Sequence, residues 1–132
     1  MKIEPYIIFN GNCREAITFY EKVFNGKITF LMEYKDAPNP PQGFDNLIMH
    51  ANLLIDDTMI MFSDTTPDIK TTFGDAVTIT VALKDQERIK QIYDVLKNGG
   101  KVRIALGKTF YSDLYAMVED KFGIVWQLII GG

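Results

Sequence analysis

A chain of 132 residues that is 47% hydrophobic and 23% charged is long enough to bury one core, and it falls in the usual size range of a single globular domain. Its net charge of −3 combines both signs without a basic run, which argues against nucleic-acid binding. The single cysteine, Cys13, excludes an internal disulfide and a thiolate metal cluster, and it is typical of a reducing compartment.

The first elements of the chain follow from hydrophobic periodicity. The β-rich run at 3–9 predicts a strand, and its surroundings lack the apolar core of a signal peptide. No apolar run approaches the length of a membrane span, so we expect a cytoplasmic protein. Residues 14–27, "REAITFYEKVFNGK", repeat apolar residues with the helical period of 3.6. Asn12 and Glu15 predict a capping box at the start of this helix, and Gly26 predicts a left-handed residue at its end.

Three more strands are predicted in the first half, at 27–34, 46–55 and 58–64. Segment 35–46 carries three of the chain's five prolines, so we expect a semi-rigid loop there. Segment 64–75 links the two halves of the chain. Loops of this length beside a sheet often act as lids, whereas most loops only connect, and both interpretations stay open for the two segments.

The second half repeats this order of elements. A strand is predicted at 76–83 and a helix at 87–100, "ERIKQIYDVLKNGG". Asp85 is the expected N-cap of this helix, and Gly99 is the expected left-handed residue at its end. Three strands follow, at 101–106, 113–120 and 124–130.

The correspondence between the halves indicates an internal duplication. A shift of 73 residues superposes the two helical patterns from the cap to the final glycine. Two βαβββ modules, at 1–64 and 75–132 with a linker at 65–74, predict an α+β fold in a single domain. Their curved mixed sheets must cover each other's apolar faces or enclose a shared cavity.

The sequence resembles the glyoxalase/bleomycin-resistance (vicinal oxygen chelate) superfamily, and specifically its PhnB-like branch. The resemblance runs nearly end to end and rests on "AITFYEKVFNGK", on "IMHANLLIDD" leading to "MIMFSD", and on the terminal "EDKFGIVWQLI". It implies two βαβββ modules whose sheets curve around a cavity, commonly in homodimers. Members of the branch often carry a demethylubiquinone methyltransferase label, which we set aside because the sequence has no Gly-rich strand-to-helix turn of the nucleotide-binding kind.

The resemblance also implies where a metal would bind. In metal-using relatives four side chains hold a divalent ion, one from the first and one from the last strand of each module. These positions fall on Pro5, Ser63, Thr78 and Gln127. Proline has no side-chain donor, and the other three are weak neutral ligands, so we expect the inherited four-ligand site to be absent. We expect no cofactor, although a divalent metal held in another way stays possible.

His50 is the only histidine and therefore the natural general acid or base, or a single metal ligand. It shares one predicted strand face with Ile48, Asn52 and Leu54, and this face is expected to line a wet cavity. The alternative is a structural histidine satisfied by a neighbouring carbonyl or carboxylate. Asp64 could supply that carboxylate, or it could cap the turn that follows it.

The other candidate residues are aromatic or polar. Gln127 is expected to face the cavity, with a half-buried position at its rim as the alternative. Cys13 lies where a helix dipole could activate a thiol, but no His or Lys adjoins it, so we interpret it as inert. Five aromatic side chains could line a pocket for a flat or apolar ligand, or they could equally be core residues: Tyr6, Phe30, Phe110, Tyr111 and Trp126.

These features favour a small-molecule-binding protein, a homodimer whose cavity is closed by the 35–46 loop and anchored by His50, Asn52 and Gln127. The alternative is a lyase or isomerase that acts on a small oxygenated substrate, with His50 as the acid/base or a metal ligand. A third hypothesis is a scaffold or regulatory dimer without a cavity. The expected partners are a small molecule and a second copy of the chain, with no nucleic acid and no membrane.

Overall fold

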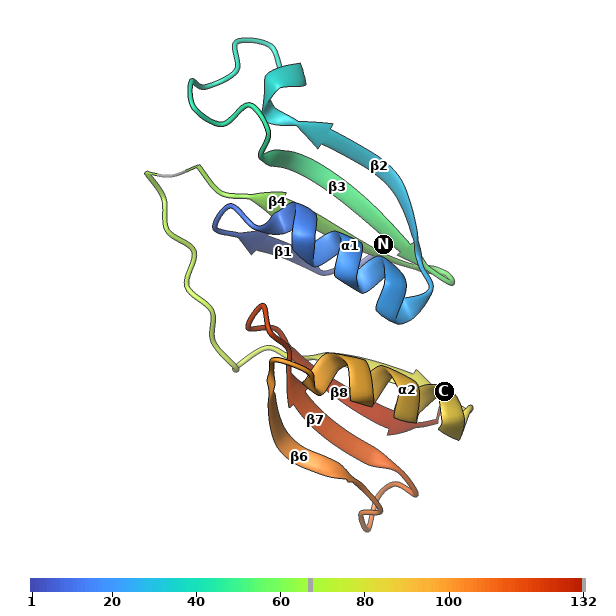
Figure 1. The fold of residues 1–132 in the computed structure, drawn as a ribbon. Coiled ribbons are helices and arrows are strands. Elements are labelled where there is room, and N and C mark those ends of the chain that lie inside the picture. The colour runs from blue at the N-terminus through green and yellow to red at the C-terminus, as the bar shows by residue number, and fades with distance from the viewer. Residues whose placement is uncertain (67, 132) are drawn as a thin grey trace. The chain divides into compact units, whose positions relative to one another are not determined.

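The computed structural model describes residues 1–66 and 68–131, and it consists of two units, Met1–Thr72 (unit 1) and Phe73–Gly132 (unit 2). Each unit is a four-stranded mixed sheet with one α-helix packed on one of its faces (Figure 1). In each unit the order is strand, helix, strand, strand, strand. The predicted α+β fold of two βαβββ modules is therefore confirmed. The module boundaries and the union of the modules in one domain stay predictions.

Unit 1 contains α1 (Cys13–Phe24) and the short 3-10 helix η1 (Tyr34–Asp36), which opens the proline-rich connection between the second and third strands. The sheet order is β1-β4-β3-β2, and only β1 and β4 run parallel. The strands are β1 (Tyr6–Phe9), β2 (Lys27–Glu33), β3 (Ile48–Ile55) and β4 (Thr58–Asp64).

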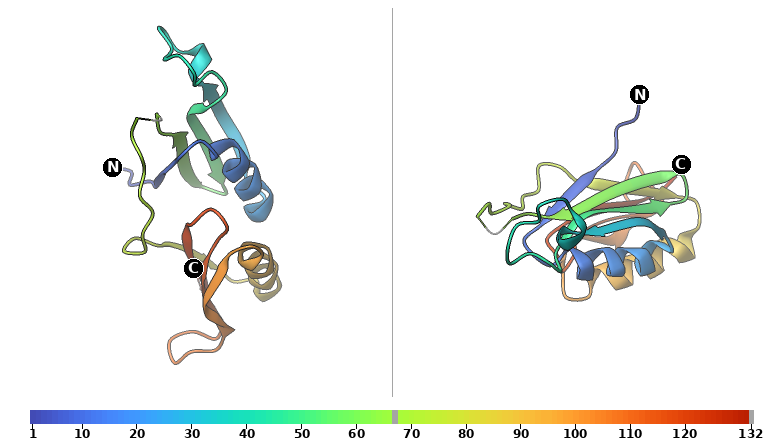
Figure 2. Two further views of the ribbon diagram at one scale, coloured as in Figure 1. Left: turned by 60° about the vertical axis from the view of Figure 1, so that its left-hand side comes forward. Right: turned by 90° about the horizontal axis from the view of Figure 1, so that it is seen from above.

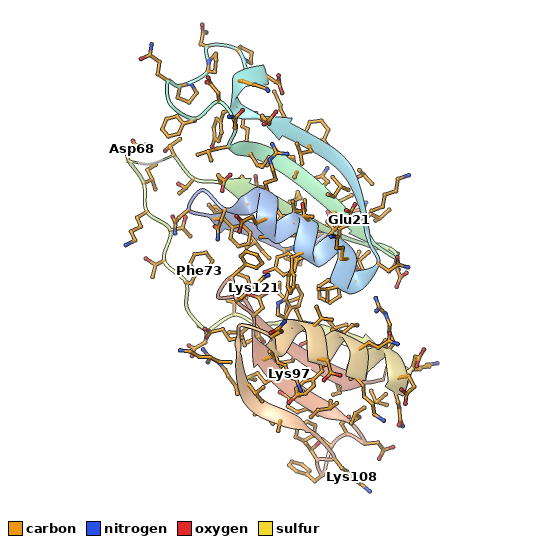
Figure 3. All side chains as sticks on the ribbon, in the orientation of Figure 1. Glu21, Asp68, Phe73, Lys97, Lys108 and Lys121 are labelled. Carbon is orange, nitrogen blue, oxygen red and sulfur yellow. The ribbon has the colours of Figure 1, made fainter. Side chains whose placement is uncertain are left out.

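The core of unit 1 lies between α1 and the sheet. The apolar stripe predicted for the helix is buried, and the Tyr20 ring lies 5.9 Å from that of Phe62 on β4. Phe9 on β1 completes this aromatic cluster at 6.3 Å from Phe62. Glu21, labelled in Figure 3, accepts a hydrogen bond from the backbone N–H of Ile28, which ties the end of α1 to β2.

The start of α1 is held differently from the prediction. Asn12 takes the N-cap position, but its side chain makes no capping hydrogen bond, so the capping box with Glu15 is wrong. Instead Asp64, at the end of β4, accepts hydrogen bonds from the backbone N–H groups of Gly11 and Cys13, each at 2.9 Å. A carboxylate from a distant strand therefore replaces the local cap.

The end of α1 also departs from the prediction by one residue. Asn25 adopts the left-handed conformation, with φ of 52°, so the assignment of that role to Gly26 is wrong. Gly26 is instead required by space, because a Cβ there would lie 3.0 Å from side-chain atoms of Leu53 and Ile55. Asparagine tolerates the left-handed region better than other non-glycine residues, which explains the exchange.

Unit 2 contains α2 (Gln86–Lys97) over a sheet of order β5-β8-β7-β6, in which only β5 and β8 run parallel. The two predicted helix ends are confirmed, since Asp85 accepts from the N–H of Arg88 at 3.2 Å and Gly99 has φ of 77°. Figure 2 shows the helix of each unit along one face of its own sheet. The strands are β5 (Ile79–Leu83), β6 (Lys101–Gly107), β7 (Tyr115–Glu119) and β8 (Val125–Ile130).

Within the described ranges, neither helix is long and apolar enough to cross a membrane.

Candidate functional site

Four predicted site residues meet on the face of the unit 1 sheet that α1 leaves uncovered. Tyr6 on β1 pairs with Met61 on β4, Met61 with Asn52 on β3, and Asn52 with Phe30 on β2. Residues paired across strands point to the same face, so these side chains form one row across the sheet. His50 lies two residues from Asn52 on the same strand. We call Tyr6, Phe30, His50 and Asn52 the His50 cluster.

A chain of hydrogen bonds runs through the His50 cluster. The side-chain oxygen of Asn52 lies 2.8 Å from Nε2 of His50, and an amide oxygen only accepts, so Nε2–H is the donor. When the imidazole carries a single proton, on Nε2, its Nδ1 accepts from the hydroxyl of Tyr6, at 3.0 Å. The Phe30 ring, on the neighbouring strand β2, has its centroid 5.9 Å from that of His50. His50 is therefore satisfied by a phenol and an amide.

The predicted face of β3 is partly wrong. His50, Asn52 and Leu54 are half-buried, as expected for one face, but Ile48 is fully buried. The register shifts at this point, because Met32 pairs with His50 while Glu33 pairs with Ile48. Met49 is thus the extra residue of a β-bulge, and the bulge turns Ile48 toward the core.

Asp64 takes neither of the roles predicted for it. Its carboxylate is 2% exposed and accepts from three backbone N–H groups, those of Gly11, Cys13 and Ile48. The carboxylate thus joins the ends of β1, β3 and β4. Burial raises the pKa of the Cys13 thiol far above its ordinary value, and the Asp64 charge raises it further, with Arg14 acting weakly in the opposite direction. Burial and a raised pKa support the interpretation of Cys13 as inert, which stays a prediction.

A second polar cluster lies in unit 2. Gln127 on β8 accepts from the hydroxyl of Tyr115 at 2.6 Å, and its amide nitrogen donates to the hydroxyl of Thr78 at 2.7 Å. The Tyr111 ring lies 5.4 Å from that of Tyr115 and 5.0 Å from that of Phe110, which is fully exposed. We call Thr78, Tyr111, Tyr115 and Gln127, with Phe110, the Gln127 cluster.

Tyr115 is the site residue that sequence reasoning missed. Its hydroxyl reaches Gln127 because β7 and β8 are paired, a relation that no local motif encodes. Burial raises the pKa of Tyr115, and the neighbouring Tyr111 raises it further. Trp126, by contrast, belongs to the core, where its indole N–H donates to Asp120 at 2.8 Å.

The positions carried over from metal-using relatives are engaged in other contacts. Pro5 offers only its carbonyl, which accepts from the N–H of Met61, and Ser63 is buried. Thr78 and Gln127 bind each other. Across residues 1–66 and 68–131, no group of three or more His, Cys, Asp or Glu side chains is arranged to hold a metal ion.

Two hollows of unit 1 lie away from the His50 cluster. One of about 310 Å³ is lined by the turn at Asn10 and Gly11 and by Lys70, and another of about 280 Å³ lies along 43–47. The Asn10 side chain exchanges two hydrogen bonds with the backbone of Thr71, at 3.0 and 2.8 Å, which fastens the linker to the β1–α1 turn. Both interpretations of this segment, a connection and a lid, stay predictions.

Known proteins resemble this chain over nearly its full length. Residues 1–129 match the model of the family described as 3-demethylubiquinone-9 3-methyltransferase. Protein YjdN of Escherichia coli (strain K12) is 30% identical over 139 residues, which cover 97% of this chain and 94% of YjdN. Protein PA1353 from Pseudomonas aeruginosa is 32% identical with a TM-score of 0.92, covering 98% of this chain and 97% of that one. The PhnB protein from Bacillus cereus is 26% identical with a TM-score of 0.86, covering 99% and 100%.

Paired βαβββ units and these matches define a protein of the glyoxalase/bleomycin-resistance (vicinal oxygen chelate) superfamily. Within it, the chain belongs to the PhnB-like family whose model is described as 3-demethylubiquinone-9 3-methyltransferase, as the resemblance in sequence predicted. The family description does not establish an activity for this chain, because one fold can support unrelated activities. The activity of this chain therefore depends on the residues of its own site.

Proposed function

We propose that the protein binds a small, flat organic molecule on the His50 cluster of unit 1, without the four-ligand metal site of its metal-using relatives. The observation that supports this proposal is the row of rings held in place by hydrogen bonds. Tyr6 and Phe30 are 44% and 46% exposed, although both are large and largely apolar. Exposed aromatic side chains beside a few fixed polar groups are typical of a ligand site.

The Gln127 cluster is proposed as a second set of ligand contacts. Phe110 and Tyr111 are exposed and stack edge to face, while Gln127 is fixed by Thr78 and Tyr115. Aromatic pairs of this geometry offer apolar surface at small entropic cost, because each ring has only two side-chain torsions.

We further propose that the chain is a single domain that forms a homodimer in the cytoplasm. Support for the dimer comes from apolar side chains that stay exposed on the sheets, Ile8 in unit 1 and Val102 and Ile104 in unit 2. Apolar side chains of this kind mark an interface where they form a contiguous patch. Light scattering on the purified protein tests the mass directly, and a monomer at micromolar concentration would refute the dimer.

A lyase or isomerase of the vicinal-oxygen-chelate type is the second candidate. The observation that favours it is the alignment of Tyr6, His50 and Asn52, since an imidazole oriented by one neighbour can move a proton through the other. A metal ion on His50 would first have to displace Tyr6 or Asn52, because both ring nitrogens are already engaged.

The two candidates separate in one set of measurements on untagged protein. Ring compounds are screened by NMR, and bound metal is counted by elemental mass spectrometry. Binding that is weakened by a bulky Asn52→Trp substitution but survives His50→Ala supports the binding protein. A turnover abolished by His50→Ala in a folded protein, or a stoichiometric divalent ion that this substitution removes, supports the enzyme instead.

A further inference from the structure

We propose that Tyr6 holds the ligand of this face by accepting a hydrogen bond from it, so that the ligand is a flat ring with an O–H or N–H donor, as in a phenol or an aniline. This inference rests on the proposed binding function of the His50 cluster and specifies the chemistry of its ligand. His50 is then a positioning residue, which sets the direction of the hydrogen bond without touching the ligand.

The direction follows from counting protons along the chain of hydrogen bonds. Asn52 offers an oxygen, so His50 keeps its one proton on Nε2 and presents a bare lone pair at Nδ1. That lone pair takes the only proton of the Tyr6 hydroxyl. The phenol oxygen is left with lone pairs and no free proton, so toward a ligand it can act only as an acceptor.

Among the three hydrogen-bonded residues of the cluster, exposure identifies Tyr6 as the one that contacts the ligand. Its side chain is 44% exposed, whereas His50 and Asn52 are half-buried, with both imidazole nitrogens and the amide oxygen already engaged. Phe30 adds an exposed ring whose centroid lies 5.9 Å from that of the imidazole. A flat ligand therefore finds apolar surface at Phe30 and an unsatisfied acceptor at Tyr6.

Charge excludes the opposite class of ligand, an oxyanion such as a carboxylate or phosphonate. In the part of the chain that the structure describes, no charged side chain takes part in the hydrogen bonds or ring contacts of the cluster. Arg14 and Lys35 both pair with Glu33, at 2.6 and 3.3 Å. An oxyanion would meet the lone pairs of Tyr6 without a cation to offset its desolvation.

The single histidine makes the first step testable by NMR without ambiguity of assignment. Nitrogen-15 shifts of the imidazole distinguish the two neutral tautomers. We expect a proton on Nε2 in the free protein at a pH where the ring is neutral. A proton on Nδ1 would reverse the chain of hydrogen bonds and overturn the inference.

The second step compares phenol, anisole and benzoate as probes. Anisole keeps the ring and the oxygen of phenol but has no donor, and benzoate is an oxyanion. Phenol should bind about three- to tenfold more tightly than either, the value of one hydrogen bond. In Tyr6→Phe this preference should vanish. In Tyr93→Phe, which removes a hydroxyl on α2 from a residue that belongs to neither cluster, it should persist.

A third variant tests the positioning role of His50. His50→Phe keeps a ring but frees the Tyr6 proton, so anisole and benzoate should gain relative to phenol. This test needs only His50→Phe to be folded, so it remains available if Tyr6→Phe fails to fold. Equal binding of the three probes to the native face would overturn the inference and leave the proposed function standing. No binding of any ring compound at the cluster would overturn the proposed function, and the inference with it.

Discussion

Removing the Asp64 carboxylate should destabilise unit 1 more than any loss of a surface charge. The carboxylate is 2% exposed and satisfies the N–H groups of Gly11, Cys13 and Ile48, each at 2.9 Å. Each buried donor left without a partner costs about 1–3 kcal/mol. The bonds to Cys13 and Ile48 are buried, so Asp64→Ala should lower the free energy of unfolding by roughly 2–6 kcal/mol.

A graded series makes this prediction sharp. Asp64→Asn keeps one oxygen for the α1 turn but turns an amide N–H₂ toward a backbone donor, so we expect a loss of about 1–3 kcal/mol. Asp57→Asn, in the exposed β3–β4 turn, is the matched control and should stay within about 0.5 kcal/mol. Urea denaturation followed by circular dichroism measures the midpoint at constant slope. A loss below about 1 kcal/mol in Asp64→Ala would contradict the view that the buried N–H groups depend on this carboxylate.

The remaining predictions concern the thiol, one glycine and two tyrosines. Cys13 should not react with a thiol reagent such as DTNB in the native protein and should react fully in denaturant, because burial holds its proton; rapid native reaction would contradict this. Gly100→Ala should cost about 1–3 kcal/mol, since the new Cβ would collide with the Glu119 carbonyl, while Gly74→Ala has open space and should be neutral by denaturation. Burial raises the pKa of Tyr34, helped by Asp64, and that of Tyr115. The native state therefore keeps protons that the unfolded chain loses as the pH rises. This contribution to the free energy of unfolding is complete below the ordinary tyrosine pKa and should disappear as the pH rises above it. If the free energy of unfolding falls equally steeply with pH in Tyr34→Phe and Tyr115→Phe, these residues are not its source.

The fold was predictable because its signals are local and repeated. Helical periodicity over 14–27 and 87–100 and the alternation of the strands need only neighbouring residues. Because both halves show the same order of elements, the assignment of each half supports that of the other. Even so, the strands at 3–9 and 76–83 are shorter than predicted, beginning at Tyr6 and Ile79, because β-propensity extends beyond the paired residues.

The site was predictable in its members but not in its connections. His50 and Asn52 stand two apart on one strand, and their shared face follows from the alternation of side chains. Tyr6, in contrast, reaches His50 across 44 residues, and only the parallel pairing of β1 with β4 brings it there. The bulge at Met49 and the reach of Asp64 to Cys13 depend in the same way on tertiary register.

The two units differ at the positions that, by the resemblance in sequence, correspond to the metal ligands of metal-using relatives. In unit 2 these positions are Thr78 and Gln127, and the Gln127 amide donates a hydrogen bond to the Thr78 hydroxyl. In unit 1 proline removes the donor at position 5, and the next residue, Tyr6, supplies the hydroxyl that reaches His50. A neutral chain of phenol, imidazole and amide can orient a ligand donor but offers little to a dication, which prefers charged oxygen. The chemistry of unit 1 therefore favours recognition of a neutral ring over chelation of neighbouring oxygens.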